Sequence, residues 1–324
     1  MKIAILFDAL GPMAVTQTHV QMVQDALPEA EVLFASKQEE LIEQEFRADV
    51  LICWATGGRF TAGKYCEFAA GLKWIHCLSA GVEGLMEDEI SQKPGLRVTC
   101  SKGIHGIPMA NHVMGFILSF LRRFPELGSN QRNHLWQRPM PEEAAGKQLC
   151  VIGMGSIGKD IAKAAKAFDM RVVGIRRSLM PVEYVDEIYP TGQLEEVLAQ
   201  SDFVVMLLPA NPATRGFMTA ARFAAMKPGA VFINVGRGQT IDEAALIASL
   251  QSGHLSGAAL DVFDPEPPAC DNPLWDMPNV IMTPHVAADT PMYMNRAFGV
   301  FVKNVPLYMK NVPMISEVDM VNQY

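Results

Sequence analysis

The chain has 324 residues, and 27 Lys and Arg against 35 Asp and Glu give it a formal net charge of −8. Hydrophobic residues make up 49% and charged residues 19%, which is enough apolar material for a folded core and excludes disorder as the main state. At about 100–200 residues per domain, this length predicts two domains. The acidic balance excludes nucleic acid and anionic membrane surfaces as partners, and it favours small molecules or other proteins.

The apolar runs are too short for a membrane protein. The longest of them, 203–210 and 113–121, fall far below the roughly 20 residues that a spanning helix needs. The first residues, MKIAILFDAL, predict a strand and are too short for a signal peptide. Six scattered cysteines without a CxxC pair indicate buried, reduced thiols. We therefore expect a soluble, cytoplasmic protein.

The first hundred residues alternate short apolar runs with helical stretches. Strands are predicted at 3–7, 31–35, 50–54 and 73–78, with helices at 16–26, 37–46 and 61–70. Strands that are apolar throughout indicate a parallel sheet covered on both faces. This part has no glycine-rich nucleotide loop after its first strand.

A long helix is predicted next, over 107–123, and it is apolar on most of its circumference. Such a helix is buried in a core or in a subunit interface, and we expect it to pack partly against a second subunit of a homodimer. The polar, proline-containing segment 128–147 then separates it from a second alternating region.

The second alternation is more regular than the first. It predicts strands at 149–152, 171–175, 203–208, 230–235, 257–260 and 280–282, and helices at 157–168, 193–199, 219–226 and 243–252. A last helix over 292–309 is expected to return and pack on the first part. The predicted fold class is α/β with two doubly wound parallel-sheet domains, the second inserted into the first: 1–103, 104–286 and 287–324.

A glycine-rich loop lies between the strand at 149–152 and the following helix, with Gly153, Gly155 and Gly158 in GxGxxG spacing around Ser156 and Ile157. The first glycine permits a tight turn, and the second lets the backbone approach a pyrophosphate. The third lets helix and strand pack closely, and the phosphates rest on the helix N-terminus. The motif in this context predicts a dinucleotide-binding Rossmann domain.

The end of the next strand bears on the choice of cofactor. An NAD-preferring fold places Asp or Glu here to bind the ribose 2′-hydroxyl, but this chain has Arg176, Arg177 and Ser178. Two guanidinium groups and a hydroxyl suit a 2′-phosphate, so NADP(H) is favoured over NAD(H). The alternative interpretation is a solvated basic turn.

Three further motifs follow strand ends, where open parallel sheets bind ligands: NVGRG at 234–238, DVFDPEP at 261–267 and TPHVA at 283–287. With the glycine loop, these motifs stand in the order found in D-isomer-specific 2-hydroxyacid dehydrogenases, which the sequence resembles along nearly its whole length. That family includes glyoxylate/hydroxypyruvate reductases. The resemblance implies a flavodoxin-like substrate domain around the Rossmann domain, and reversible hydride transfer between a nicotinamide cofactor and a small 2-keto or D-2-hydroxy acid.

The residue types suit this chemistry. Reduction of a 2-keto acid needs a cation for the carboxylate and an acid for the developing alkoxide. Arg237 offers a two-pronged guanidinium for the carboxylate or keto oxygen. His285 can exchange a proton near neutral pH, and Glu266 can hold its ring. Taken singly, these residues have plainer interpretations as a surface cation, a strand-end cap and a rigid loop.

The resemblance also implies roles that the residues alone do not give. It sets Asp261 near the nicotinamide, and Pro209 and Thr214 by the cofactor ribose. It makes Ser79, Ala80 and Gly81 the loop whose backbone amides hold the substrate carboxylate, as amide nests hold anions. It suggests that Trp136 reaches a partner subunit's pocket, although plain interface packing is an equal alternative.

The other histidines, His76, His105, His112 and His134, lack the mutual spacing of a metal site, so no metal is expected.

Two other functions fit the same fold. Formate or phosphite dehydrogenases are disfavoured, because phosphite enzymes have Lys where this chain has Ser79 and formate enzymes are longer. A non-catalytic NAD(P)-sensing regulator would be expected to lack the Arg237, Glu266 and His285 set or to carry long basic tails.

Overall fold

The computed structural model describes residues 1–7, 14–55, 62–86 and 89–319. The chain divides into two compact units, one formed by Met1–Ile104 with Thr290–Tyr324 and the other by His105–Asp289. The second unit is therefore inserted into the chain of the first. The boundaries expected from the sequence, after 103 and 286, lie one and three residues before this division.

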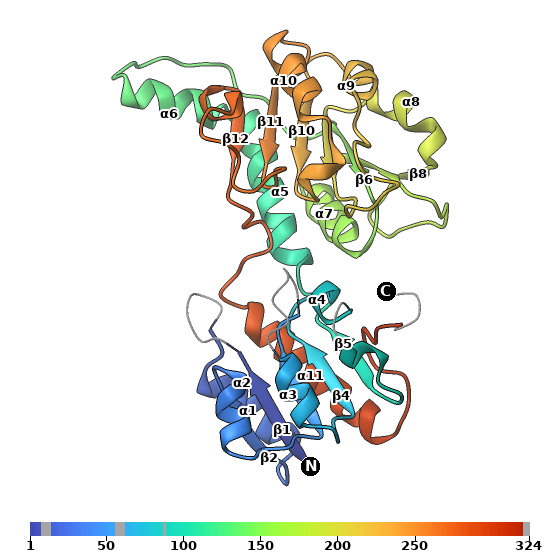
Figure 1. Ribbon diagram of the computed structural model, residues 1–324. Coiled ribbons are helices and arrows are strands. Elements are labelled where there is room, and N and C mark those ends of the chain that lie inside the picture. The colour runs from blue at the N-terminus through green and yellow to red at the C-terminus, as the bar shows by residue number, and fades with distance from the viewer. Residues whose placement is uncertain (8–13, 56–61, 87–88, 320–324) are drawn as a thin grey trace. The chain divides into compact units, whose positions relative to one another are not determined.

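The first unit is built on a five-stranded parallel sheet in the order β2-β1-β3-β4-β5 (Figure 1). This is the strand order of flavodoxin-like folds. The strands are β1 (Lys2–Leu6), β2 (Glu31–Ala35), β3 (Val50–Cys53), β4 (Trp74–Cys77) and β5 (Arg97–Cys100). Both β3 and β4 are buried at every position, and β3 is apolar throughout, whereas β4 buries the polar His76.

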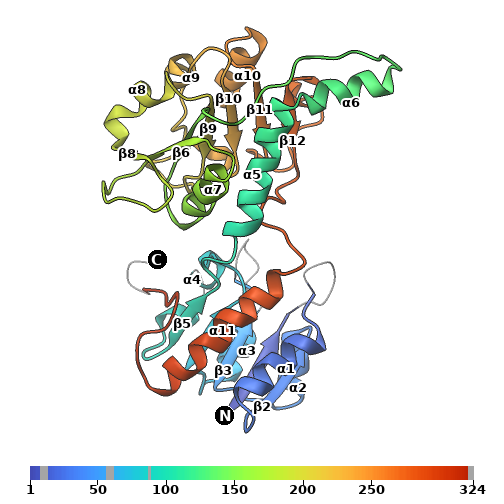
Figure 2. The same ribbon diagram turned by 180° about the vertical axis from the view of Figure 1, so that it is seen from behind.

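Helices cover both faces of this sheet. One core contains side chains of α1 (Gln17–Ala26) and α11 (Tyr293–Met309), and the other contains side chains of α2 (Gln38–Glu43) and α3 (Gly63–Phe68). The short helices α4 (Glu83–Met86) and η1 (Glu89–Gln92) follow β4. Thr61, the expected first residue of the third helix, lies outside the described residues. As predicted, the last helix returns to the first unit and packs against α1 (Figure 2).

A buried hydrogen-bonded chain attaches the returning helix to the sheet. The indole Nε1 of Trp74 donates to Thr99 Oγ1 at 2.9 Å, and His76 Nδ1 lies 2.8 Å from the same oxygen. On its other side, His76 Nε2 lies 3.3 Å from the carbonyl oxygen of Ala297 in α11. A carbonyl only accepts, so Nε2 carries the proton and Nδ1 accepts from Thr99. Burial lowers the pKa of His76 to about 4, so the ring is neutral at pH 7.

The second unit contains a seven-stranded parallel sheet in the order β12-β11-β10-β9-β6-β7-β8. The chain starts in the middle at β6, winds outward to β8 and then crosses to β9, as in dinucleotide-binding folds. The strands are β6 (Gln148–Ile152), β7 (Arg171–Ile175), β8 (Glu187–Tyr189), β9 (Phe203–Met206), β10 (Val231–Asn234), β11 (Gly257–Leu260) and β12 (Val280–Met282). The prediction of two doubly wound parallel sheets is confirmed.

Two cores again flank the sheet. One contains α5 (Gly106–Leu121) and α7 (Ser156–Lys166), and the other contains α8 (Leu194–Leu198), α9 (Ala220–Ala225) and α10 (Glu243–Gln251). The short helices η2 (Thr191–Gln193), η3 (Gly238–Thr240) and η4 (Pro273–Asp276) lie in loops. Within the described residues, no helix is both long and apolar enough to cross a membrane.

The expected helix over 107–123 is α5, and one of its faces is buried within its own unit. Val113, Met114 and Ile117 pack in the same core as α7 and the sheet, whereas Ile107 is 59% exposed. More exposed apolar side chains come from the next segment, an arm formed by α6 (Phe124–Arg132) and residues 133–143 that projects from its unit (Figures 1 and 2). Trp136 is 96% exposed there and Met140 84%.

Several local expectations are wrong. The segment after residue 123 forms a further helix, α6, which was not predicted and which overlaps the start of the polar segment 128–147. The strands β5 and β8 were not predicted, since both are short and carry charged or polar residues. Five cysteines are buried and outside any disulfide, as expected, but Cys270 is exposed.

Candidate active site

Strand order brings the motifs together at one edge of the second sheet. The loops after β10, β11 and β12 carry Arg237, Glu266 and His285, and these three strands are neighbours. The glycine loop follows β6, which lies between β7 and β9 at the point where the winding reverses. Open parallel sheets bind ligands at such a point, outside the carboxyl ends of the strands.

The glycine loop has the backbone geometry that a phosphate cradle requires. Gly153 has φ +96°, a left-handed conformation that side chains oppose. A Cβ on Gly158 would lie 2.9 Å from Met154 Sδ in the loop and 3.3 Å from Val151 Cγ1 in β6, so α7 packs closely against the strand. Gly155, just before α7, has only its own loop's Gly153 oxygen within 4 Å of such a Cβ, at 3.9 Å. The space in front of the helix N-terminus is therefore open, and the residues fit a bound pyrophosphate.

Arg176, Arg177 and Ser178 leave β7 on an outward-facing turn, where Arg177 and Ser178 are exposed. Among the described residues, neither guanidinium has an ion-pair partner, although the Arg176 N–H donates to the Tyr189 carbonyl at 3.2 Å. The loop after β9 is organised by Thr214, whose hydroxyl donates to the Pro209 carbonyl at 2.5 Å. The turn after β7 is thus held by a main-chain hydrogen bond that leaves its two guanidinium groups available to a ligand, and the loop after β9 is held by the Thr214 hydroxyl.

His285 and Glu266 form a direct pair. His285 Nδ1 lies 2.8 Å from Glu266 Oε2, and the other carboxylate oxygen of Glu266 accepts from the Phe263 N–H at 2.9 Å. The carboxylate is an acceptor, so Nδ1 carries the proton and Nε2 remains for proton exchange. The His285 side chain is 46% exposed, so a reactant can reach it. Its φ of +55° is a rare conformation for a non-glycine residue.

Asp261 holds the loop on which His285 stands. Its carboxylate is almost fully buried and accepts from Thr283 Oγ1 at 2.5 Å and from the N–H groups of Val286 and Ala287, each at 2.9 Å. The Asp261 carbonyl also accepts from the His285 N–H at 2.9 Å. Both carboxylate oxygens are therefore engaged with the loop itself. The pKa of Asp289 is raised by burial and, secondarily, by the charge of Asp261.

The loop after β10 presents Arg237 to solvent on a fixed backbone. Buried Asn234 accepts from the Gly236 N–H at 3.1 Å and donates to the Arg237 carbonyl at 3.2 Å. The Arg237 guanidinium contacts only the Gly236 carbonyl among the described residues, at 2.8 Å. A Cβ on Gly238 would lie 2.1 Å from the Phe263 carbonyl carbon and oxygen. The arginine loop and the Glu266 loop thus meet backbone to backbone.

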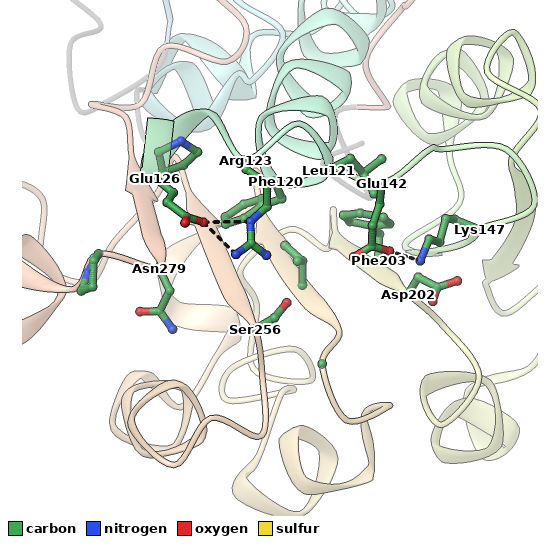
Figure 3. A pocket seen from close by; sticks show the side chains of 14 residues that line it. Phe120, Leu121, Arg123, Glu126, Glu142, Lys147, Asp202, Phe203, Ser256 and Asn279 are labelled. Carbon is green, nitrogen blue, oxygen red and sulfur yellow. Dashed lines mark hydrogen bonds and ion pairs between the residues drawn. The ribbon is translucent and has the colours of Figure 1, made fainter. Parts of the chain in front are cut away.

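Two cavities lie at different ends of the second sheet. One of about 490 Å³ adjoins the histidine–glutamate pair and is lined by Phe263, Glu266, Pro267, Pro268, Trp275, Met282, Thr283, Pro284 and His285. The other, of about 430 Å³, lies by the start of β9 and β10 (Figure 3). Its charged groups are already paired, Arg123 with Glu126 and Lys147 with Glu142. The first cavity is the one beside reactive groups.

The loop expected to hold a substrate carboxylate belongs to the first unit, after β4. Ser79 is buried, and its hydroxyl donates to the Gly81 carbonyl at 2.7 Å and accepts from the Ala55 N–H at 3.3 Å. Ala80 and Gly81 are half-buried. The serine side chain thus shapes the turn and is not free to contact a ligand, which leaves that task to main-chain groups.

The described residues contain no cluster of three or more His, Cys, Asp and Glu side chains arranged to hold a metal ion.

A family comparison joins these observations. Residues 114–287, more than half of the chain, match the model of the D-isomer specific 2-hydroxyacid dehydrogenase NAD-binding domain. The chain belongs to the D-isomer specific 2-hydroxyacid dehydrogenase family. The second unit of this dehydrogenase-family chain is accordingly its NAD-binding domain, with the glycine loop, Arg237, Glu266 and His285 all inside the matched range.

Individual relatives support the assignment. D-3-phosphoglycerate dehydrogenase of Methanocaldococcus jannaschii is 35% identical over 277 residues, which are 83% of this chain but only 51% of that protein. This dehydrogenase-family chain thus spans about half the length of that curated relative.

Solved structures match the chain over nearly its whole length. A D-isomer specific 2-hydroxyacid dehydrogenase family protein from Aeromonas salmonicida has a TM-score of 0.84 at 32% identity, covering 98% of this chain and 99% of that one. The NADPH-dependent glyoxylate/hydroxypyruvate reductase of Sinorhizobium meliloti, solved with NADP and sulfate, has a TM-score of 0.79 at 29% identity and covers 100% of both chains.

Two residues that sequence reasoning did not single out organise the site: Asn234 and Thr283. Asn234 lies in the NVGRG motif and Thr283 opens the TPHVA motif, so the signal was present. A motif does not specify that Asn234 bonds the backbone of its own loop or that Thr283 donates to Asp261 in another loop.

Proposed function

We propose that this chain is an NADP(H)- or NAD(H)-dependent oxidoreductase that interconverts small 2-keto acids and D-2-hydroxy acids. The observation that carries the proposal is the contact of His285 Nδ1 with Glu266 Oε2 at 2.8 Å, which is accessible to solvent. His285 follows β12 and Arg237 follows β10, and only β11 lies between these two strands. An oriented imidazole and a nearby cation are the two groups that carbonyl reduction requires.

The bound cofactor would supply the hydride. His285 donates a proton from Nε2 to the keto oxygen during reduction and takes it back during oxidation. Glu266 keeps the ring in the orientation that leaves Nε2 available and stabilises the imidazolium by its charge. Arg237, whose guanidinium has a single protein contact among the described residues, binds the substrate carboxylate and polarises the carbonyl.

Cofactor binding is assigned to the glycine loop and the two following turns. The pyrophosphate rests on Gly153, Gly155, Ser156, Ile157 and Gly158 at the N-terminus of α7. Arg176, Arg177 and Ser178 bind the 2′-phosphate, so NADP(H) is preferred, and Pro209 and Thr214 border the ribose. The unpaired guanidinium groups support this preference, and so does the NADP-bound Sinorhizobium meliloti reductase. Asp261 is assigned a place near the nicotinamide, where it holds the loop that carries His285.

We assign substrate binding to the first unit, which would be the substrate domain, with main-chain groups of Ser79, Ala80 and Gly81 holding the carboxylate. Buried Ser79 fixes the turn from within, which supports a rigid anion cradle.

We infer a homodimer in the cytoplasm. The surface for a second subunit is the region of the 107–123 helix, extended by the arm at 124–143, where exposed Phe124, Leu135, Trp136 and Met140 gather. Five buried cysteines outside any disulfide suit a reducing compartment. Sedimentation of a Trp136→Ala variant tests the interface, and an unchanged dimer would remove Trp136 from it.

The activity is tested by following NADPH and NADH oxidation with glyoxylate, hydroxypyruvate and pyruvate, and by running D-3-phosphoglycerate with the oxidised cofactors. The last substrate is included because the Methanocaldococcus jannaschii relative is named for it. Turnover of a 2-keto acid, faster with NADPH, supports the proposal. Tight NADPH binding without turnover of any acid would favour a nucleotide sensor, and turnover of formate or phosphite alone would favour those dehydrogenases.

A further inference from the structure

His112, on the buried face of α5, contacts the loop that carries His285. Its Nε2 lies 3.1 Å from Thr283 Oγ1 and 3.8 Å from Asp261 Oδ1. The ring stands edge-on against Phe116, with ring centroids 4.4 Å apart. The first helix of this unit, α5, thus contacts the residue after β12, Thr283, which lies two positions before the proposed acid–base residue His285.

The direction of each hydrogen bond follows from proton counting. Thr283 has one hydroxyl proton, and it is donated to Asp261 Oδ1 at 2.5 Å. Thr283 Oγ1 has no second proton to donate, so it accepts from His112 Nε2, and Nε2 carries the proton of the ring. Asp261 in turn accepts from the N–H groups of Val286 and Ala287. The chain runs in one direction, from α5 through a hydroxyl and a carboxylate to the two residues after His285.

His112 is neutral in this arrangement. Burial lowers its pKa, and this effect outweighs the attraction of Asp261, which acts in the opposite direction. The neutral ring still donates through Nε2. Replacing His112 by an apolar ring therefore removes a hydrogen-bond donor and leaves the net charge beside Asp261 unchanged near pH 7.

We propose that His112 is a positioning residue for the acid–base loop: it fixes the Thr283 hydroxyl as a donor to Asp261, whose carboxylate holds the main chain directly after His285. The inference rests on the proposed function of His285 as the proton donor. His285 stands at a φ of +55°, a conformation that persists only where the surroundings enforce it. The hydrogen bonds that run from His112 through Thr283 to Asp261 restrain this conformation from a separate helix, α5.

The expected loss is in turnover rather than in binding. The polar contacts of His112 among the described residues are with Thr283 and Asp261, away from the glycine loop and the Arg176 turn to which most of the cofactor is assigned, so cofactor affinity should change little. Outer residues that orient a functional histidine are typically worth about 10- to 100-fold in activity at metal sites, and we expect about tenfold in kcat here. The KM for the keto acid should change less than about threefold, because His112 does not contact the groups assigned to bind the substrate in its ground state.

The experiment compares matched variants of the full chain. His112→Phe keeps a flat ring against Phe116 but cannot donate, and His112→Gln places an amide N–H at about the reach of Nε2. Thr283→Val removes the hydroxyl at nearly constant shape, and Thr283→Ser restores it. His254→Phe is the control, because His254 is half-buried in the same unit and its Nε2 has no hydrogen-bond partner among the described residues.

We expect His112→Phe and Thr283→Val to lower kcat about tenfold each, and the double variant to be no slower than either alone, since both break one chain. His112→Gln and Thr283→Ser should retain most of the wild-type kcat, and His254→Phe should retain all of it. Amide exchange at Val286 and Ala287, measured without substrate, should be faster in both apolar variants.

Three outcomes would overturn the inference: full kcat in His112→Phe, losses that multiply in the double variant, or no restoration by Gln at an unchanged melting temperature. If the wild type turns over no keto acid, the proposed function fails. The exchange rates at Val286 and Ala287 then still decide whether His112 holds the loop.

Discussion

Replacing Gly238 by alanine should separate the two loops that carry the proposed chemistry. The added Cβ would lie 2.1 Å from both the carbonyl carbon and oxygen of Phe263 and 2.7 Å from the Asp264 nitrogen, whereas ordinary contact begins at 3.4 Å. All three neighbours are main-chain atoms, so no side chain can rotate away. The loops must move apart by more than about 1 Å, which costs about 1–3 kcal/mol of unfolding free energy as overpacking does.

The catalytic loss should exceed the loss of stability. Gly238 adjoins Arg237, and Phe263 donates its N–H to Glu266 at 2.9 Å, so the same displacement separates the carboxylate-binding cation from the group that orients His285. A misplacement of about 1 Å can cost about 10²-fold in rate. We therefore expect kcat with the best keto acid to fall about 100-fold while NADPH binding is nearly unchanged.

The assay pairs steady-state kinetics with urea unfolding, and Gly192→Ala serves as control. Gly192 has no atom within 4 Å of its added Cβ and no left-handed φ, so its replacement should leave kcat unchanged and stability equal or slightly higher. Wild-type kcat and stability in Gly238→Ala would refute the backbone contact between the loops. A large loss of stability with full kcat would show that this contact does not position the site.

Three further predictions concern single residues. His285→Ala should lower kcat by about 10²–10⁴-fold and leave the NADPH dissociation constant in place, as loss of a general acid does; a mild effect would remove His285 from that role. Arg176→Asp should move the ratio of kcat/KM for NADPH over NADH towards NADH, because a carboxylate repels a 2′-phosphate; an unchanged ratio would mean that the turn is not the phosphate site. Buried His76 has its pKa lowered to about 4, so the unfolded chain binds its proton first as the pH falls below about 6.5, and stability is lost down to about pH 4. Between pH 7 and 5, wild type should lose about 2 kcal/mol more unfolding free energy than His76→Asn, and equal losses would contradict the neutral buried ring.

Local sequence was sufficient for the parallel strands and for the glycine loop. Runs such as 50–53 and 257–260 are apolar at every position because both faces of their sheets are covered, and such runs stand out without any knowledge of neighbours. The glycines of the 153–158 loop are required by the backbone of the turn itself. The strands β5 and β8 escaped because charged residues such as Arg97 and Glu187 interrupt short segments whose strand state depends on a neighbour in the sheet.

The candidate site shows the same division. The motifs around Arg237, Glu266 and His285 identify side chains with suitable chemistry, but they do not say which atom meets which. The 2.8 Å pair of His285 with Glu266 joins loops after two different strands and follows from the order of β11 and β12. The apolar circumference of α5 predicted a buried helix, and one face is buried within its unit, but periodicity reports burial and not which surface covers the remaining face.

The sequence by itself determined the class of fold, the nucleotide loop and the reactive residue types, because each depends on local periodicity or on the conformational range of one residue. Only the tertiary structure decided that Asp261 holds the His285 loop, that Gly238 is in contact with a neighbouring backbone and that His112 donates to Thr283. These roles depend on contacts of about 3 Å between residues that are as far as 171 positions apart in the sequence. Such contacts arise from the winding of the whole sheet, which no segment of the chain encodes alone.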